Sequence, residues 1–214
     1  MDFLTPELNN YIEAHIRPES DVLKKLNRET YAKMMMPRML SGHLQGQVLR
    51  MLSMMIKPKR ILEIGTFTGY SGICLSAGLI DGGLLHTIDI NEEYSEIVNR
   101  YFKEAGVENK IKRYTGNAID IIPAINESFD LVFIDADKEN YSNYYDLVFD
   151  KVPKGGYILA DNVLWSGKVL ENKKDMDIDT KAIVAYCDKI QKDERVENVL
   201  FPIRDGIMVA RKIV

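Results

Sequence analysis

Hydrophobic and polar positions follow two different patterns along the chain, and the change falls near Lys59. Before that point the pattern is helical. Thr5 caps a helix start with Pro6 in its first turn, residues 18–20 interrupt the chain, and residues 37–56 lead into an apolar helix. After that point, short apolar runs typical of buried strands alternate with segments of helical length. We therefore predict one domain, residues 1–214, with amino-terminal helices at 1–57 and a sheet-containing core at 58–214.

The order of elements in the second part predicts the fold class. Strands are predicted at residues 60–65, 84–90, 110–116, 129–137, 155–165, 196–203 and 206–214, and helices at residues 70–80, 92–106, 118–125, 141–152 and 178–191. Such alternation is typical of a doubly wound parallel sheet. The short link at residues 204–206 suits a hairpin, so the last strand should run antiparallel. We expect an α/β fold with a mostly parallel seven-stranded sheet. Only the charged segment 166–177 is predicted to be loose.

Composition narrows the class of protein. The 214 residues are 46% hydrophobic and 28% charged, which is ordinary for a globular protein, and the net charge of -4 argues against non-specific nucleic-acid binding. Cys74 and Cys187 lack the spacing of a metal site and are interpreted as two reduced, buried thiols, which indicates a cytoplasmic protein. The amino-terminal segment has no signal-peptide pattern, and no apolar run is long enough to span a membrane.

A glycine-rich turn follows the first predicted strand. In "EIGTFTGYSG", Gly65, Gly69 and Gly72 have the spacing G-x-x-x-G-x-x-G, which lets a ligand approach bare backbone at a helix start. This spacing matches neither the dinucleotide fingerprint nor the P-loop, so an NAD-dependent oxidoreductase is disfavoured. Asp89 ends the next strand, where a carboxylate can accept hydrogen bonds from a ribose diol. The pattern predicts a nucleoside-bearing cofactor; the alternative is a tight turn with a capping aspartate.

Polar side chains end two later strands. Asp135 closes one apolar run, and Asp161 with Asn162 closes the next. Neighbouring parallel strands lie about 4.8 Å apart, so these three oxygen donors can meet. Two carboxylates and an amide suit Mg²⁺, Mn²⁺ or Ca²⁺ rather than zinc. Lys138 follows three residues after Asp135, so its amine should lie beside the same point. A dication there would lower the pKa of the amine, which favours a role as a base. The alternatives are turn-forming aspartates and a solvated surface lysine.

Four segments together resemble a known family. "EIGTFTGYS", "GNAI", "FIDADKENY" and "ADNVLWSG" are similar to the cation-dependent class I O-methyltransferases, the catechol and caffeoyl-CoA O-methyltransferase group, over about Met39 to Arg211. The resemblance implies a Rossmann-like methyltransferase fold. It also implies S-adenosylmethionine as cofactor with a divalent cation, Mg²⁺ above all. The implied reaction is methyl transfer to a hydroxyl of a small catechol-like or phenolic acceptor.

The same resemblance implies roles for individual residues. Positions matching the family's cofactor contacts are Met39, Ser41, Glu63, Gly65, Thr66, Tyr70, Ser71, Asp89, Asn117, Ala118, Asp135 and Asp137. Asp135, Asp161 and Asn162 match the metal ligands, which gives Asp135 a catalytic role as well. Lys138 matches the lysine taken as general base and contacts substrate. Trp165 either walls the substrate pocket, as the matching family residue does, or packs in the core.

The remaining predictions concern partners and alternative functions. Relatives usually dimerise, so we expect a homodimer, with the methionines at positions 34–36, 51, 54 and 55 in the core or at an interface. One alternative function is a transfer RNA 5-hydroxyuridine O-methyltransferase. It would use a basic surface formed by Lys24, Lys25, Arg28, Lys33 and Arg38. The other is a non-catalytic nucleotide-binding protein, which the joint presence of Asp135, Lys138, Asp161 and Asn162 disfavours.

Overall fold

Seven strands form a single sheet in a computed structural model that describes residues 4–214; residues 1–3, which open the amino-terminal segment discussed above, lie outside it. The strands are β1 (Arg60–Ile64), β2 (Leu84–Asp89), β3 (Ile111–Thr115), β4 (Leu131–Ile134), β5 (Tyr157–Asp161), β6 (Val196–Phe201) and β7 (Ile207–Lys212). Their order is β3-β2-β1-β4-β5-β7-β6. β1 to β5 pair in parallel, whereas β7 runs antiparallel to both β5 and β6. The predicted sheet and its antiparallel last strand are confirmed.

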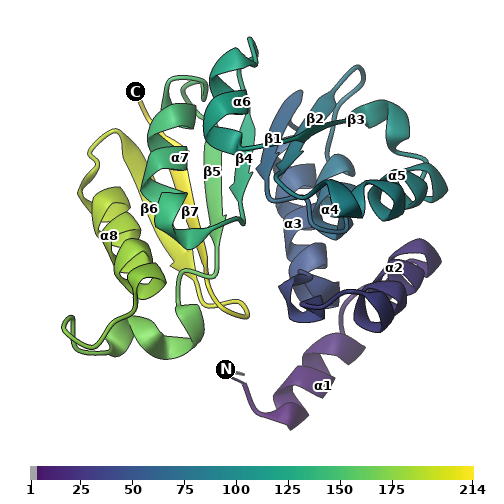
Figure 1. Ribbon diagram of the computed structural model, residues 1–214, viewed down its shortest axis with the longest axis horizontal. Coiled ribbons are helices and arrows are strands. Elements are labelled where there is room, and N and C mark those ends of the chain that lie inside the picture. Colours follow the sequence, from purple (N-terminus) through teal and green to yellow (C-terminus); the bar gives the residue numbers. More distant parts are fainter. Residues whose placement is uncertain (1–3) are drawn as a thin grey trace.

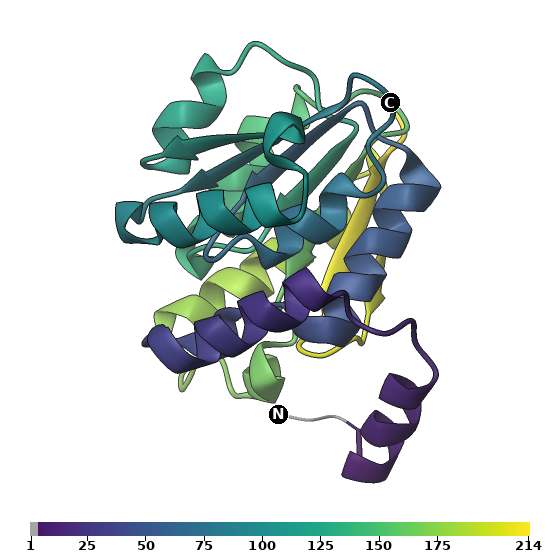
Figure 2. The same ribbon diagram turned by 90° about the vertical axis from the view of Figure 1, so that its right-hand side faces the viewer.

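Helices cover both faces of this sheet (Figure 1). The α-helices of the described residues are α1 (Pro6–Ala14), α2 (Asp21–Lys33), α3 (Gly42–Ile56), α4 (Tyr70–Ser76), α5 (Ser95–Glu104), α6 (Ala118–Ala124), α7 (Tyr141–Phe149) and α8 (Ile178–Lys192). Helices α2 to α5 pack on one face and α6 to α8 on the other. Helix α1 buries none of its residues and extends away from the sheet in both views (Figures 1 and 2).

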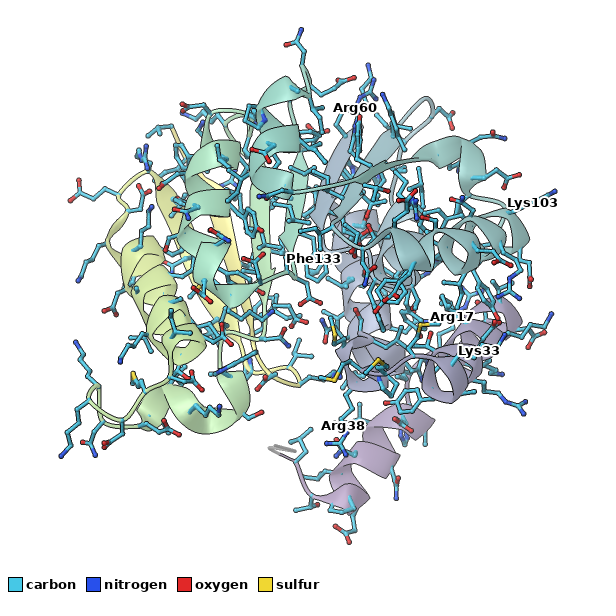
Figure 3. All side chains as sticks on the ribbon, in the orientation of Figure 1. Arg17, Lys33, Arg38, Arg60, Lys103 and Phe133 are labelled. Atoms are coloured by element: carbon cyan, nitrogen blue, oxygen red, sulfur yellow. The ribbon has the colours of Figure 1, made fainter. Side chains whose placement is uncertain are left out.

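The alternation of side chains along each strand divides the core into two layers. In β1, Leu62 belongs to the layer under α6 to α8, and Ile61 belongs to the layer under α2 to α5. In β4, Val132 and Phe133 divide in the same way. Successive side chains of a strand point to opposite faces, so a sheet covered on both sides needs continuous apolar runs. Phe133 accordingly lies inside the molecule, whereas Lys33 and Lys103 extend from its surface (Figure 3).

Several predicted boundaries differ from those observed. The helix predicted within residues 37–56 begins only at Gly42, because residues 37–39 form a separate 3-10 turn, η1, and Leu40 is extended. The segment predicted to be loose contains 3-10 turns at η5 (Trp165–Leu170), in which Ser166 and Gly167 are left-handed. Arg204 donates to the carbonyl oxygen of Leu40 beside η1, and Asp205 accepts from the Ser166 N–H in η5. These partners are distant in sequence, so local pattern does not reveal them.

The predicted burial of two kinds of sulfur-containing side chain needs correction. Met34 packs against the core, but Met35 is 96% exposed, and Met36, Met51, Met54 and Met55 are also exposed. The core interpretation is therefore confirmed for Met34 and wrong for the other five. The interface interpretation and the homodimer stay predictions, which sedimentation velocity would test. Both cysteines are free thiols, but only Cys74 is buried and Cys187 is partly exposed. Across residues 4–214, no helix has the length and apolar character needed to cross a membrane.

Candidate active site

A cavity of about 810 Å³ opens at the carboxyl ends of the parallel strands. Of the residues predicted from the sequence, the cavity brings together Met39, Ser41, Gly65, Thr66, Tyr70, Ser71, Asp89, Asn117, Ala118, Asp135, Asp137, Lys138, Asp161, Asn162 and Trp165. Only Glu63 does not line it and lies behind its wall, fully buried. The chain crosses this edge of the sheet after each parallel strand, so residues far apart in sequence converge there.

The glycine-rich turn is built around Gly65 and Asp89. Gly65 has a φ of +102°, and a Cβ atom at this position would overlap the backbone carbonyl oxygen of Asp135. The Asp89 carboxylate closes the turn: its Oδ2 accepts hydrogen bonds from the backbone N–H groups of Thr66 (3.0 Å) and Phe67 (2.7 Å). Its Oδ1 accepts from Asn91 N–H (2.8 Å). A carboxylate offers about four acceptor sites, so Asp89 caps the turn and keeps roughly one site for a ligand.

A buried chain of hydroxyls connects the cavity wall to Glu63. The Thr66 hydroxyl lies 2.5 Å from that of Thr87, and Thr87 donates to Glu63 Oε2 at 2.5 Å. The other oxygen, Oε1, has no hydrogen-bond partner among residues 4–214. Loss of solvation raises the pKa of Glu63 to about 7, and the nearby charges of Asp135 and Asp89 add to this effect. The Glu63 carboxyl group therefore helps to hold Thr66 in place through Thr87, without facing the cavity.

Replacing Glu63 with glutamine should change how stability depends on pH. The native carboxyl binds more protons than the unfolded one between the ordinary pKa of 4.5 and the raised value of about 7, so wild-type stability falls as pH rises through this window. The amide does not titrate. We expect Glu63→Gln to match wild type near pH 4 and to exceed its free energy of unfolding by on the order of 3 kcal/mol at pH 8. Urea unfolding at both pH values measures the difference, with the exposed Glu108→Gln as control; a pH-independent difference would contradict the assignment.

The predicted convergence of two strand ends is confirmed. β4 and β5 are paired in parallel, with Ile134 opposite Ala160, so Asp135 and Asp161 follow side by side. The ammonium group of Lys138 donates to Asp135 Oδ1 (3.2 Å), Asn162 Oδ1 (2.8 Å) and the Tyr141 hydroxyl (2.6 Å). All three of its N–H donors are thus used, and Lys138 is only 8% exposed. The interpretation of Lys138 as a solvated surface lysine is wrong.

Asp161 carries the least satisfied acceptor of this cluster. Its Oδ2 accepts a hydrogen bond from Gln45 Nε2 at 2.6 Å, whereas its buried Oδ1 has no partner in the described chain. Burial and the negative charge of Asp135 raise the pKa of Asp161 to about 7. A buried carboxylate oxygen without a partner is costly, and a cation would relieve that cost.

The donor set decides which cation fits this cluster. Within residues 4–214, no group of three His, Cys, Asp or Glu side chains could hold a metal ion. The oxygens of Asp135, Asp161 and Asn162 are instead two carboxylates and one amide, which suit a hard divalent cation. The residues present therefore fit the predicted metal, with Lys138 now supplying the positive charge between Asp135 and Asn162.

Sequence reasoning missed several residues of the cavity wall. Asp137 accepts hydrogen bonds from the Tyr144 hydroxyl and from Asn140 Nδ2, both at 2.5 Å. The rings of Phe67 and Tyr94 meet edge to face at 5.2 Å beside Asp89. The missed residues are Phe67, Tyr94, Asn140 and Tyr144. Phe67 and Asn140 stand within the quoted motifs without a predicted role, because the contacts of all four depend on helix starts and turns that only the fold brings to the cavity.

Trp165 has the core packing of one alternative, and its contact with a substrate stays a prediction. It lines the cavity and also packs against the core under α6 to α8. The Lys138 ammonium lies 5.7 Å from the centre of its ring. An aromatic wall beside the amine and the carboxylates suits a flat acceptor.

Comparisons with known proteins cover nearly the whole chain. A family model described as O-methyltransferase matches residues 13–213. The caffeoyl-CoA O-methyltransferase of Petroselinum crispum is 34% identical over 214 residues, which cover 94% of this chain and 88% of the relative. The O-methyltransferase from Bacillus cereus in complex with SAH has a TM-score of 0.88 at 27% identity and covers 96% of this chain and 97% of its own. TomG from Streptomyces achromogenes, in complex with SAM, has a TM-score of 0.88 at 26% identity and covers 97% and 96%.

Proposed function

This chain belongs to the O-methyltransferase family, and from that premise we propose that it transfers a methyl group from S-adenosylmethionine to a hydroxyl of a small catechol-like or phenolic acceptor, assisted by a divalent cation. The observation that carries the proposal is the cluster of Lys138, Asp135, Asp161 and Asn162 on the wall of a cavity whose volume suits a cofactor with a small acceptor. The two solved relatives with SAH and SAM support the choice of methyl donor.

The cofactor would lie along the glycine-rich turn. Asp89, with its remaining acceptor site, would bind a ribose hydroxyl, and Asn117 and Ala118 would lie beside the adenine. Gly65 leaves the backbone of the turn open to the methionine end, near Ser71. The aromatic pair of Phe67 and Tyr94 would flank the ribose in the same cavity. The acceptor site left on Asp89 and the open backbone at Gly65 thus match the ribose and the methionine end of S-adenosylmethionine.

Asp135, Asp161 and Asn162 would hold the divalent cation. Bound there, the ion would act as a Lewis acid that makes an acceptor hydroxyl more acidic. The chain's own part is to supply two carboxylates, and Oδ1 of Asp161 has no hydrogen-bond partner among residues 4–214. It also supplies Lys138, which donates hydrogen bonds to Asp135 and Asn162. From this position Lys138 could form a hydrogen bond to the acceptor hydroxyl instead.

Lys138 is proposed as the general base. Its amine, freed of a proton, takes the acceptor's hydroxyl proton at Nζ. The acceptor oxygen then forms a bond to the sulfonium methyl while the carbon–sulfur bond breaks, and neutral S-adenosylhomocysteine leaves. The donor already carries an activated methyl group, so the protein's task is to align the two reactants in line and to exclude water. The wall formed by Trp165 would hold a flat ring in that alignment.

A methyl-transfer assay tests the function directly. With labelled S-adenosylmethionine and Mg²⁺, we expect transfer to members of a catechol panel and its loss on adding a chelator, because deprotonation of the acceptor depends on the cation. Bulk transfer RNA serves as the comparison acceptor. Labelling of transfer RNA in place of the catechols would refute the acceptor class, and transfer that is indifferent to chelator would refute the cation.

A further inference from the structure

Asp161 takes part in a set of hydrogen bonds that does not include Lys138. Gln45, on α3, is 1% exposed and donates from Nε2 to Asp161 Oδ2 at 2.6 Å. Arg204, in the hairpin turn between β6 and β7, donates from Nη1 to Gln45 Oε1 at 3.1 Å. The three residues come from three separate elements and form one chain that ends at the proposed cation ligand.

The arginine decides which way the amide of Gln45 faces. A guanidinium has donors and no acceptor, so it can only meet the carbonyl end of an amide. The Gln45 NH₂ group is therefore directed at Asp161, where it occupies Oδ2. With that oxygen held, Oδ1 is the atom of Asp161 left without a partner in the part of the chain described.

Arg204 is itself fixed in place. Its Nη1 also donates to the backbone carbonyl oxygens of Leu40 (3.1 Å) and Ser41. The hairpin turn holds the loop that follows Asn162 as well, because Leu164 N–H donates to Asp205 O at 2.8 Å. The turn thus connects η1, α3 and the end of β5, which are the elements around the ligand.

We propose that Gln45 and Arg204 are positioning residues that orient the Asp161 carboxylate, keeping Oδ2 occupied and Oδ1 free for a divalent cation. This inference rests on the cation site of the proposed function. Residues that orient a metal ligand from behind typically change metal affinity by about 10–100-fold when they are replaced. Arg204 also lines the cavity, but neither it nor Gln45 would touch the cation, so their effect on cation affinity would pass through Asp161.

The test is Mn²⁺ affinity, measured by electron paramagnetic resonance on the full chain saturated with S-adenosylhomocysteine. Gln45→Met keeps the side-chain length and removes the donor. We expect its Kd for Mn²⁺ to rise about 10–100-fold, while its Kd for S-adenosylhomocysteine stays within about twofold of wild type. The matched control is Gln191→Met, the same change at an exposed position of α8, which should leave both constants unchanged.

Arg204 supplies the second variant, on an exposed turn where a substitution spares the core. Arg204→Met should weaken Mn²⁺ binding in the same direction, and Arg204→Lys, which keeps a donor, should restore part of it. Wild-type Mn²⁺ affinity in folded Gln45→Met, or in Arg204→Met if the first variant does not fold, would overturn the inference. A lower thermal midpoint with unchanged Mn²⁺ affinity would do so too, since it indicates a structural role alone. Failure of the wild-type chain to bind Mn²⁺ would instead refute the proposed cation site, and the inference with it.

Discussion

Replacing Lys138 with methionine is expected to lower kcat by roughly 10²–10⁴-fold, the usual contribution of a positioned general base. Methionine fills a similar volume but cannot take a proton, and it removes three hydrogen bonds to Asp135, Asn162 and Tyr141. Because Lys138 lies among the proposed cation ligands, its loss should not weaken cofactor binding. Initial rates with labelled S-adenosylmethionine and calorimetric titration with S-adenosylhomocysteine measure the two effects separately.

Arginine at the same position distinguishes a base from a fixed positive charge. Lys138→Arg keeps the charge, yet a guanidinium does not lose its proton in proteins, so its turnover should fall about as far as that of Lys138→Met. Near-normal turnover in Lys138→Arg would refute the base assignment. Lys112→Met is the matched control, because Lys112 also lies over a tyrosine ring, 5.1 Å from the centre of Tyr114, but is exposed and away from the cavity.

Gly65→Ala is expected to cost about 2–5 kcal/mol of the free energy of unfolding and to weaken cofactor binding. Two penalties add at this position. A φ of +102° is unfavourable for alanine by roughly 1–2 kcal/mol. The new Cβ would also overlap the backbone carbonyl oxygen of Asp135, and relieving that overlap by moving β4 costs about 1–3 kcal/mol more. Urea unfolding gives the stability change, and titration with S-adenosylhomocysteine gives the change in affinity.

Gly82→Ala separates the two penalties. Gly82 also has a positive φ, +72°, but a Cβ there would meet no atom within 4 Å. Its cost should therefore be the backbone penalty alone, about 1–2 kcal/mol, with cofactor affinity unchanged. Equal stability losses in Gly65→Ala and Gly82→Ala would mean that the close approach of β4 to the turn has no energetic consequence.

The sequence predicted the sheet well because burial acts on local patterns. A strand covered on both faces must be apolar throughout, and a helix on its surface must be apolar along one side, so periodicity alone located β1 to β7. The same reasoning placed Asp135 and Asp161 at neighbouring strand ends, since the order of parallel strands and helices limits which strands can pair. The motifs also identified the family, which the match over residues 13–213 confirms.

The exposure of whole side chains was less predictable. Met51, Met54 and Met55 look like core residues because an apolar run does not show which of its side chains are covered by other parts of the chain. Glu63 looked like a cofactor contact from its place in the motif, yet β1 directs it into the layer behind the cavity wall. In both cases the deciding fact is what packs against the residue, and distant parts of the chain supply that.

The amino-acid sequence by itself determined the order of the elements, the glycine-rich turn and the set of oxygen and amine groups at the strand ends, because each depends on residue type and local spacing. Only the tertiary structure decided how these groups are satisfied. It brought three acceptors to Lys138 and the Gln45 amide to Asp161, and it joined Gln45 to Asp161 and Arg204 across 116 and 159 residues of sequence. Hydrogen bonds act over about 3 Å in space whatever the separation along the chain, so local spacing leaves their partners undetermined.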